Sequence, residues 1–161
     1  MTAFPETIPA LLEARAASSP DLSWLFHEGD SWTLVDVARE VDRVAVGLAE
    51  RGTVAGDRVA LLAGNGPDAL FAWLATNRLG AIAAPLNPAL KRPELAAIFR
   101  LTRPRVIVVA TEHRALAESA CGDLDLAVRP TIALAGELAA AGQGAPRAQL
   151  AIFLRHCSRK N

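Results

Sequence analysis

The sequence has few cysteines, and this limits the kinds of site that it can hold. Its two cysteines, Cys121 and Cys157, lie far apart and in no Cys-x-x-Cys spacing. His156 precedes Cys157, yet no second pair of ligands follows at the spacing of a zinc site. We therefore predict neither a disulfide framework nor a metal site.

The sequence also lacks an excess of charge of either sign. Its 17 basic residues balance 17 acidic ones, so the formal net charge is +0. Proteins that bind nucleic acid through its phosphate backbone present a basic surface. We therefore expect no nucleic-acid partner.

Long apolar runs are missing as well. A membrane-spanning helix needs a run of about 18 apolar residues, and the sequence has none. The first residues, Met1 to Glu6, show no basic segment followed by an apolar one, which a secretory signal would have. These absences predict a cytoplasmic protein without a membrane span.

Alanine is abundant where aromatic residues are scarce. Apolar residues make up 52% of the sequence and aromatic residues 5%. Much of the apolar content is alanine, which favours helices over an all-β design. The 161 residues suit one domain or one part of a larger one.

Residues 34–49 form the clearest helix that the sequence predicts. Thr33 and Asp36 have the spacing of a capping box at its start, and Gly52 follows its end. Apolar residues recur along it at three- and four-residue intervals. The residues that we expect this helix to bury are Val37, Val41, Val44 and Leu48.

The segment before this helix predicts another helix and a hairpin. Residues 7–18 have apolar side chains at helical spacing, with Pro9 in the first turn, where proline is tolerated. Residues 22–27 and 31–33 flank a turn at Glu28-Gly29-Asp30, and they predict two short antiparallel strands.

Farther along the chain, helical segments alternate with short apolar runs. A cap is expected at Asn65-Gly66-Pro67-Asp68, before a helix that ends at Gly80. Further helices are expected at 93–100 and 112–120, and strands at 58–62, 81–85, 105–110 and 131–134. This alternation predicts an α/β fold with a mainly parallel sheet flanked by helices. The strands expected in that sheet include 59–62, 82–84 and 106–109.

The last part of the sequence changes in composition. Residues Gly136 to Gln149 are rich in alanine and glycine and contain one proline, which predicts a surface loop. Residues Leu150 to Leu154 form an apolar run that predicts one more strand. We expect residues 155–161 to be a disordered end.

Three groups of residues occur in an order typical of one family. The first is Ser31-Trp-Thr-Leu34, just before the amphipathic helix. The second joins Gly47-Leu-Ala49, Gly56-Asp-Arg-Val-Ala60 and Asn65-Gly-Pro67. The third runs from Asn77 through Gly80 to Asn87-Pro88 and Glu94-Leu95. Together, over residues 7–110, they resemble the adenylate-forming, AMP-binding superfamily of acyl-CoA synthetases, peptide-synthetase adenylation domains and luciferases.

This resemblance implies a fold and a chemistry. Residues 1–154 would be a partial AMP-binding domain, its N-terminal subdomain only, and residues 155–161 would be a tail outside the family pattern. Full-length members use ATP and Mg²⁺ to activate a carboxylic acid as an acyl-adenylate, and they pass the acyl group to CoA. The resemblance thus implies a ligase, with fatty acid metabolism as its setting.

The sequence lacks the family's phosphate loop, which resembles Thr-Ser-Gly-Thr-Thr-Gly-x-Pro-Lys-Gly, and the family's catalytic lysine. Such a loop needs glycine for close backbone approach, and hydroxyl and lysine groups to bind phosphate oxygens. We therefore expect a truncated acid–CoA ligase that is inactive alone. No catalytic, cofactor-binding or metal-binding residue, and no cofactor, is expected within it. A frameshift or premature stop after Leu154 is our hypothesis for the loss.

An alternative is a stand-alone binding or interaction domain that keeps the fold without the chemistry. A Rossmann-type nucleotide binder is excluded, because no G-x-G-x-x-G follows a predicted strand. The sequence distinguishes neither the acyl substrate nor the oligomeric state.

A few further residues invite a functional interpretation. We expect Trp32 and Trp73 to pack in the core or between subdomains and not to form a substrate platform. Some CoA ligases of the resembling family place a basic residue for CoA just after the Asn-Pro pair. That position is Ala89 here, with Lys91 and Arg92 close behind, and we expect these two to be a solvated helix start.

Overall fold

The computed structural model describes residues 6–122, 124 and 130–143. In chain order its elements are α1 (Ile8–Ser18), β1 (Ser23–His27), β2 (Asp30–Thr33), α2 (Leu34–Glu50), β3 (Arg58–Leu62), α3 (Pro67–Arg78), β4 (Ile82–Pro85), α4 (Arg92–Thr102), β5 (Val106–Val109), the 3-10 turn η1 (Thr111–His113), α5 (Arg114–Gly122), β6 (Thr131–Leu134) and α6 (Ala135–Ala141).

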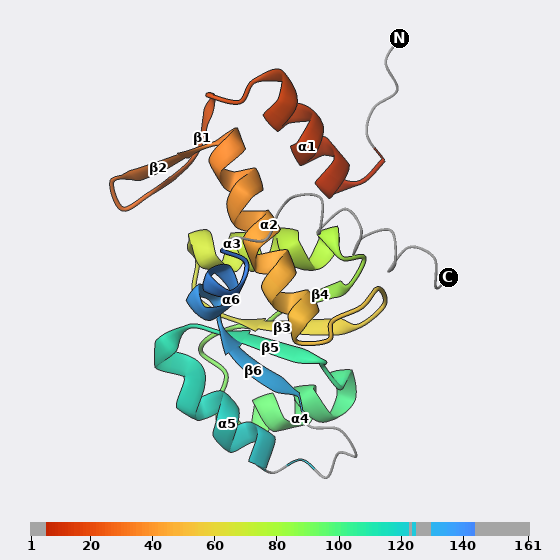
Figure 1. Cartoon of the computed structure of the whole chain (residues 1–161). Coiled ribbons are helices and arrows are strands. Elements are labelled where there is room, and N and C mark those ends of the chain that lie inside the picture. Colours follow the sequence, from red (N-terminus) through yellow and green to blue (C-terminus); the bar gives the residue numbers. More distant parts are fainter. Residues whose placement is uncertain (1–5, 123, 125–129, 144–161) are drawn as a thin grey trace.

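Four strands form a parallel sheet in the order β4-β3-β5-β6, and β1 and β2 form a separate antiparallel hairpin. The predicted parallel strands and the predicted hairpin are therefore confirmed. Because β4 and β5 lie on opposite sides of β3, the crossover from β3 to β4 runs in one direction, and those from β4 to β5 and from β5 to β6 run in the other. Right-handed crossovers then place helices on both faces of the sheet. Figure 1 shows α4 and α5 on one face and α2, α3 and α6 on the other.

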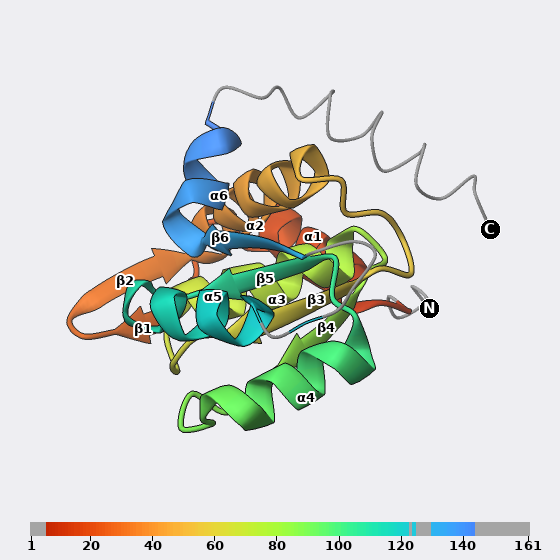
Figure 2. The same ribbon diagram turned by 90° about the horizontal axis from the view of Figure 1, so that it is seen from below.

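Side chains of the central strands alternate between two cores. Val59 and Leu61 of β3 lie in the core that α2, α3 and α6 cover. Leu62, with Ala60, lies in the core that α4 and α5 cover, where Phe99 is fully buried. This period of two is the pattern of a sheet that is buried on both faces. Figure 2 shows the sheet between these two layers of helices.

Helix α2 forms where its capping box and apolar spacing predict it. The Thr33 hydroxyl oxygen accepts a hydrogen bond from the Asp36 N–H at 3.2 Å, and the Asp36 carboxylate accepts one from the Thr33 N–H at 3.2 Å. Gly52 follows the helix with a φ of 80°, the left-handed conformation that glycine adopts at low cost. The four residues that we expected it to bury, Val37, Val41, Val44 and Leu48, are 2% exposed or less.

The first helix and the hairpin lie outside this two-layered body and pack against α2 (Figure 1). An arginine joins three helices here. Arg78 of α3 pairs with Glu13 of α1 at 2.6 Å and with Asp42 of α2 at 2.9 Å. Only 11% of the Arg78 side chain is exposed, so these pairs fix its position more firmly than surface pairs would.

The loop predicted at Gly136–Gln149 is wrong for its first part, because residues 135–141 form α6. Alanine is the best helix former, and the Leu134 N–H donates to the Glu137 carboxylate at 3.1 Å, which satisfies one donor at the helix start. The α6 residue Leu138 is fully buried. Its backbone packs so closely on Gly47 of α2 that a Cβ there would lie 2.4 Å from the Leu138 carbonyl oxygen. The rest of that segment, the strand predicted at 150–154 and the tail 155–161 lie outside the described residues.

Candidate functional site

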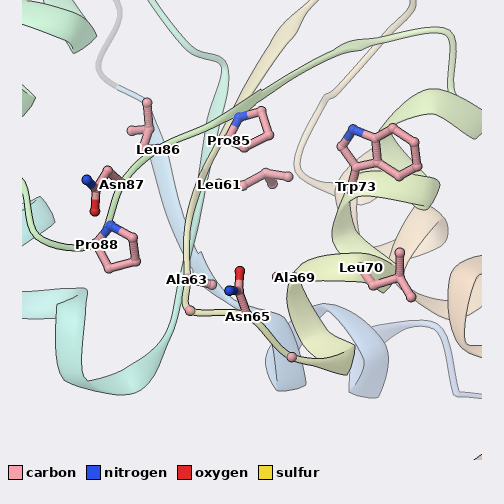
Figure 3. Close-up of a pocket in the computed structure, with 12 residues that line it drawn as sticks. Leu61, Ala63, Asn65, Ala69, Leu70, Trp73, Pro85, Leu86, Asn87 and Pro88 are labelled. Carbon is pink, nitrogen blue, oxygen red and sulfur yellow. The ribbon is translucent and has the colours of Figure 1, made fainter. Parts of the chain in front are cut away.

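A pocket of about 600 Å³ opens at the edge of the sheet where β3 and β4 end. The loop after β3 and the segment after β4 form two of its walls, and α3 forms the third (Figure 3). The carboxyl ends of parallel strands are where α/β proteins bind ligands, because the loops that vary between proteins meet there. We call this cavity the carboxyl-edge pocket. Its described lining residues are Leu61, Ala63, Gly64, Asn65, Gly66, Ala69, Leu70, Trp73, Pro85, Leu86, Asn87 and Pro88.

Two amides supply the polar groups of this lining. Asn65 comes from the loop after β3 and Asn87 from the segment after β4, as Figure 3 shows, and both are exposed. The Asn87 Oδ1 accepts a hydrogen bond from the Ala89 N–H at 2.9 Å, and this turn fixes the side chain. Because that bond uses only the amide oxygen, the Asn87 NH₂ group keeps both of its donors for a ligand.

The helix start predicted at Asn65–Asp68 is present, but its N-cap is Gly66 and not Asn65. Pro67 is the first residue of α3, and no side chain caps the helix. Asn65 therefore lies before the cap, where its side chain is available to the pocket. His27 of the hairpin lies beside this point, since a Cβ on Gly66 would be 3.6 Å from the His27 Nε2.

The two tryptophans have different surroundings. Trp32 is half-buried and packs edge-on against Phe71, with ring centroids 6.2 Å apart and an interplanar angle of 73°. Trp73 packs against the core and also forms part of the pocket wall beside Leu70 (Figure 3). The core packing expected of both residues is present, and for Trp73 it is combined with a surface that a ligand could contact.

The described lining residues include no acid, base, hydroxyl or thiol. Lys91 and Arg92 are exposed at the start of α4, outside this lining, and the Lys91 N–H donates to the Glu94 carboxylate at 2.7 Å. Within the part of the chain that the structure describes, no three metal-ligating side chains gather. The pocket therefore has the chemistry of a binding surface for uncharged groups.

Acidic groups with perturbed pKa values lie at helix starts and not in this pocket. The Thr33 hydroxyl, and after it the Thr33 N–H, hold the pKa of Asp36 below its ordinary value. The Leu134 N–H, and then Arg114, hold the pKa of Glu137 below its ordinary value. These shifts arise from capping, so they indicate helix stabilisation and not a tuned catalytic group.

Asn65 and Asn87 belong to separate sequence motifs, and no local pattern predicts that they share a pocket. Asn65 and Asn87 stand 22 positions apart, and only the parallel pairing of β3 with β4 places the ends of the two strands side by side. The signal available in the sequence was that each residue comes within three positions of the end of a predicted strand.

Comparison with known proteins shows which family this chain resembles. The model of the family described as AMP-binding enzyme matches residues 12–151. Feruloyl-CoA synthase from Amycolatopsis sp. is 37% identical over 99 residues, which are 62% of this chain and 20% of that protein. The chain spans 16% to 20% of the length of the first curated relatives that it matches.

Solved structures of similar enzymes share the fold. The N-terminal domain of FACL13 from Mycobacterium tuberculosis superposes with a TM-score of 0.76 at 26% identity, covering 88% of this chain and 37% of that one. The anthranilate CoA ligase AuaEII, solved with anthranoyl-AMP, superposes with a TM-score of 0.74 at 28% identity, covering 81% of this chain and 25% of that one. Within the described residues, no helix has the length and hydropathy to cross a membrane.

Proposed function

The chain belongs to the AMP-binding enzyme family, and from this premise we propose that it supplies the amino-terminal subdomain of an acid–CoA ligase. In that reaction ATP activates a carboxylic acid as an acyl-adenylate, and CoA then accepts the acyl group. We propose further that these 161 residues do not catalyse either step alone. Feruloyl-CoA synthase and the anthranilate CoA ligase, which are similar to it, support this class of reaction.

The observation that carries the proposal is the lining of the carboxyl-edge pocket. Its walls are mostly apolar, and Asn65 and Asn87 add neutral amides at the opening. Such a surface suits an uncharged part of a substrate, because apolar atoms lose little by leaving water and the amides can bond to a carbonyl or an N–H. The pocket volume of about 600 Å³ is in the range of ligand sites.

The same lining does not fit ATP with Mg²⁺. Phosphate oxygens need several N–H, hydroxyl or cationic donors, and Mg²⁺ needs carboxylate oxygens. The described lining residues offer no hydroxyl, lysine or carboxylate, and the sequence contains no phosphate loop of the family type. We therefore assign no step of phosphate or metal chemistry to these residues.

The first test asks whether the chain activates an acid by itself. Purified chain would be incubated with ATP, Mg²⁺, labelled pyrophosphate and a panel of carboxylic acids, and the exchange of label into ATP would be measured. We expect exchange equal to a protein-free blank. Acid-dependent exchange above that blank, removed by heating the protein, would contradict the second part of the proposal.

The second test asks whether the fold serves a ligase. Residues 12–151, which match the family model, would replace the corresponding segment of feruloyl-CoA synthase, and feruloyl-CoA formation by the chimera would be measured. We expect activity, with Asn87→Ala and Trp73→Ala each raising a substrate KM by about tenfold, the loss of one good hydrogen bond or apolar contact. Arg100→Ala, on the exposed side of α4, is the control and should leave KM unchanged. A folded chimera without activity would contradict the ligase proposal.

A stand-alone binding domain is the second candidate, and the same pocket favours it, because a lining without reactive groups binds without reacting. Calorimetry of the chain alone with a carboxylic acid or with CoA separates the two candidates. Saturable binding that Asn87→Ala weakens, together with an inactive chimera, would support the binding domain. An active chimera would support the ligase.

A further inference from the structure

A second cavity, of about 400 Å³, lies between the first helix and the hairpin, at the end of the molecule that α1 forms in Figure 1. We call it the α1 groove. Its described lining residues are Ile8, Leu11, Leu12, Arg15, Leu22, Trp24, Leu34 and Leu74. None of them lines the carboxyl-edge pocket, and the function proposed above makes no use of them.

The walls of the α1 groove leave large apolar side chains in contact with water. Ile8 is 46% exposed, Leu22 49% and Trp24 47%, although Leu12 beneath them is buried. Phe26 continues the same edge of β1 and is 68% exposed. Leu25, between Trp24 and Phe26 in β1, packs against the core instead. The pairing of β1 with β2 is irregular between Ser23 and Leu25, at the position of Trp24. Large apolar side chains that stay exposed around a cavity are typical of a place where a ligand or partner binds.

One charged residue stands among these apolar walls. Arg15 lies on α1 and is exposed, and it is the only ionisable residue in the described lining. No carboxylate among the described residues pairs with its guanidinium group. Glu13 stands two positions before Arg15 on α1 and pairs with Arg78 of α3 at 2.6 Å. Residues two positions apart on a helix do not face each other, so this acid does not neutralise Arg15. The groove therefore combines an apolar floor with one uncompensated positive charge.

We propose that the α1 groove binds an amphiphilic anion, a molecule with one alkyl chain and one carboxylate. The alkyl chain lies against Leu22, Trp24 and the apolar residues of α1, and the carboxylate pairs with the Arg15 guanidinium. Charge complementarity selects an anion, because a guanidinium group offers a carboxylate paired donors in a matching geometry. Size selects a small ligand, because about 400 Å³ lies within the range of ligand sites, whereas a stable protein partner covers about 800 Å² on each side.

The experiment compares three probes that differ only in the head group. Decanoate, decanol and decyltrimethylammonium would each be titrated by calorimetry into the full 161-residue chain, the two ions below their micelle concentrations and decanol below its solubility limit. We expect one saturable site with the order decanoate, decanol, decyltrimethylammonium from tightest to weakest. The difference between decanoate and decanol should be about threefold to tenfold, and it should shrink at high salt, because the ion pair is partly exposed.

Variants locate the binding site within the chain. Arg15→Gln should weaken decanoate by about threefold to tenfold and leave decanol unchanged, because only the ion pair is lost. Leu22→Ser should weaken both probes, because it removes apolar surface. Arg100→Gln, an exposed arginine on the opposite face of the sheet, is the matched control and should change neither. Circular dichroism of each variant confirms that it remains folded.

Other outcomes overturn the proposal. Equal binding of decanoate and decanol to the wild-type chain, no saturable binding, or equal effects of Arg15→Gln and Arg100→Gln would each do so. If Asn87→Ala abolishes decanoate binding and Arg15→Gln leaves its affinity unchanged, the ligand binds in the carboxyl-edge pocket instead. A chain that sediments as a dimer, and as a monomer after Trp24→Ser, would assign the groove to a second copy.

Discussion

The two edges of the parallel sheet carry different kinds of residues. At the amino edge, where strands begin and the preceding helices end, arginines cover helix ends. The Arg58 Nε donates to the Thr102 carbonyl at the end of α4. Arg51 donates to the Gly47 carbonyl at 3.0 Å in the last turn of α2. At the carboxyl edge the described lining of the pocket has no charged group.

The direction of the helices explains this difference. In a parallel α/β fold the negative ends of the helices lie at the amino edge of the sheet, where arginines are stabilising. Acids stabilise helix starts in the same way, and Asp36, Glu94 and Glu137 each accept a backbone N–H at the start of α2, α4 or α6. Helix α3 starts differently, because no side chain caps it, although Asp68 lies in its first turn. Several charges of the described residues thus stabilise helix ends, and the uncapped start of α3 borders the pocket.

The largest effect on stability should come from the close packing of α6 on the last turns of α2. Gly47→Val would place side-chain atoms against the Leu138 backbone, which an ideal Cβ on Gly47 already meets at 2.4 Å. Backbone cannot move aside easily, so we expect a loss of about 3 kcal/mol in the free energy of unfolding, measured in urea. Gly136→Ala in α6 is the control, because a Cβ there meets nothing within 4 Å. Equal stability of the two variants would show that α6 does not dock on α2 this way.

Two glycines with different surroundings, one at each edge, extend the comparison. Gly52 at the amino edge has a φ of 80°, and a Cβ there would lie 2.5 Å from the Arg105 Nη2. Gly52→Ala should therefore lower the free energy of unfolding by about 1 to 2 kcal/mol. Gly64 at the carboxyl edge has open space around it, so Gly64→Ala should change stability by about 0.5 kcal/mol at most. If Gly64→Ala lowers the free energy of unfolding as much as Gly52→Ala does, the two edges do not differ in this way.

The capping acids give a smaller effect that depends on pH. Because hydrogen bonds from Thr33 lower the pKa of Asp36 in the folded chain, its stabilisation is full above the unfolded-state pKa and is lost as pH falls through the folded-state value. We expect wild type to lose stability below about pH 4, and Asp36→Asn to lose less over the same range. At pH 7, Asp36→Ala should cost about 1 kcal/mol. Identical pH curves for wild type and Asp36→Asn would refute this account of the cap.

The smallest effect should come from the pocket itself. Asn65 is exposed and caps no helix, so Asn65→Ala should change the free energy of unfolding by less than about 0.5 kcal/mol. Thermal denaturation of this variant beside Asp36→Ala provides the measurement. A loss as large as that of Asp36→Ala would mean that Asn65 stabilises the fold and is not available to a ligand.

Local sequence determined the elements whose signals lie within one segment. The capping box at Thr33 and Asp36 and the spacing of Val37 to Leu48 specify α2, because N-capping and an apolar stripe depend on residues a few positions apart. The apolar runs of β3 and β5 specify buried parallel strands for a similar reason. The order of the Gly, Asn and Pro motifs was sufficient to indicate the family.

Tertiary structure decided what depends on contacts between distant segments. Helix α6 is stable where its Leu138 meets Gly47, and no pattern within an alanine-rich segment reveals that glycine partner. Asn65 and Asn87 share a pocket because β3 pairs with β4, and Arg15 lines a groove because α1 packs beside Trp24 of β1 and Leu74 of α3. In each case burial is set by neighbours far away in the chain. The sequence by itself therefore determined most of the elements and their family, whereas packing decided α6, which residues bind one another and which remain available to a ligand.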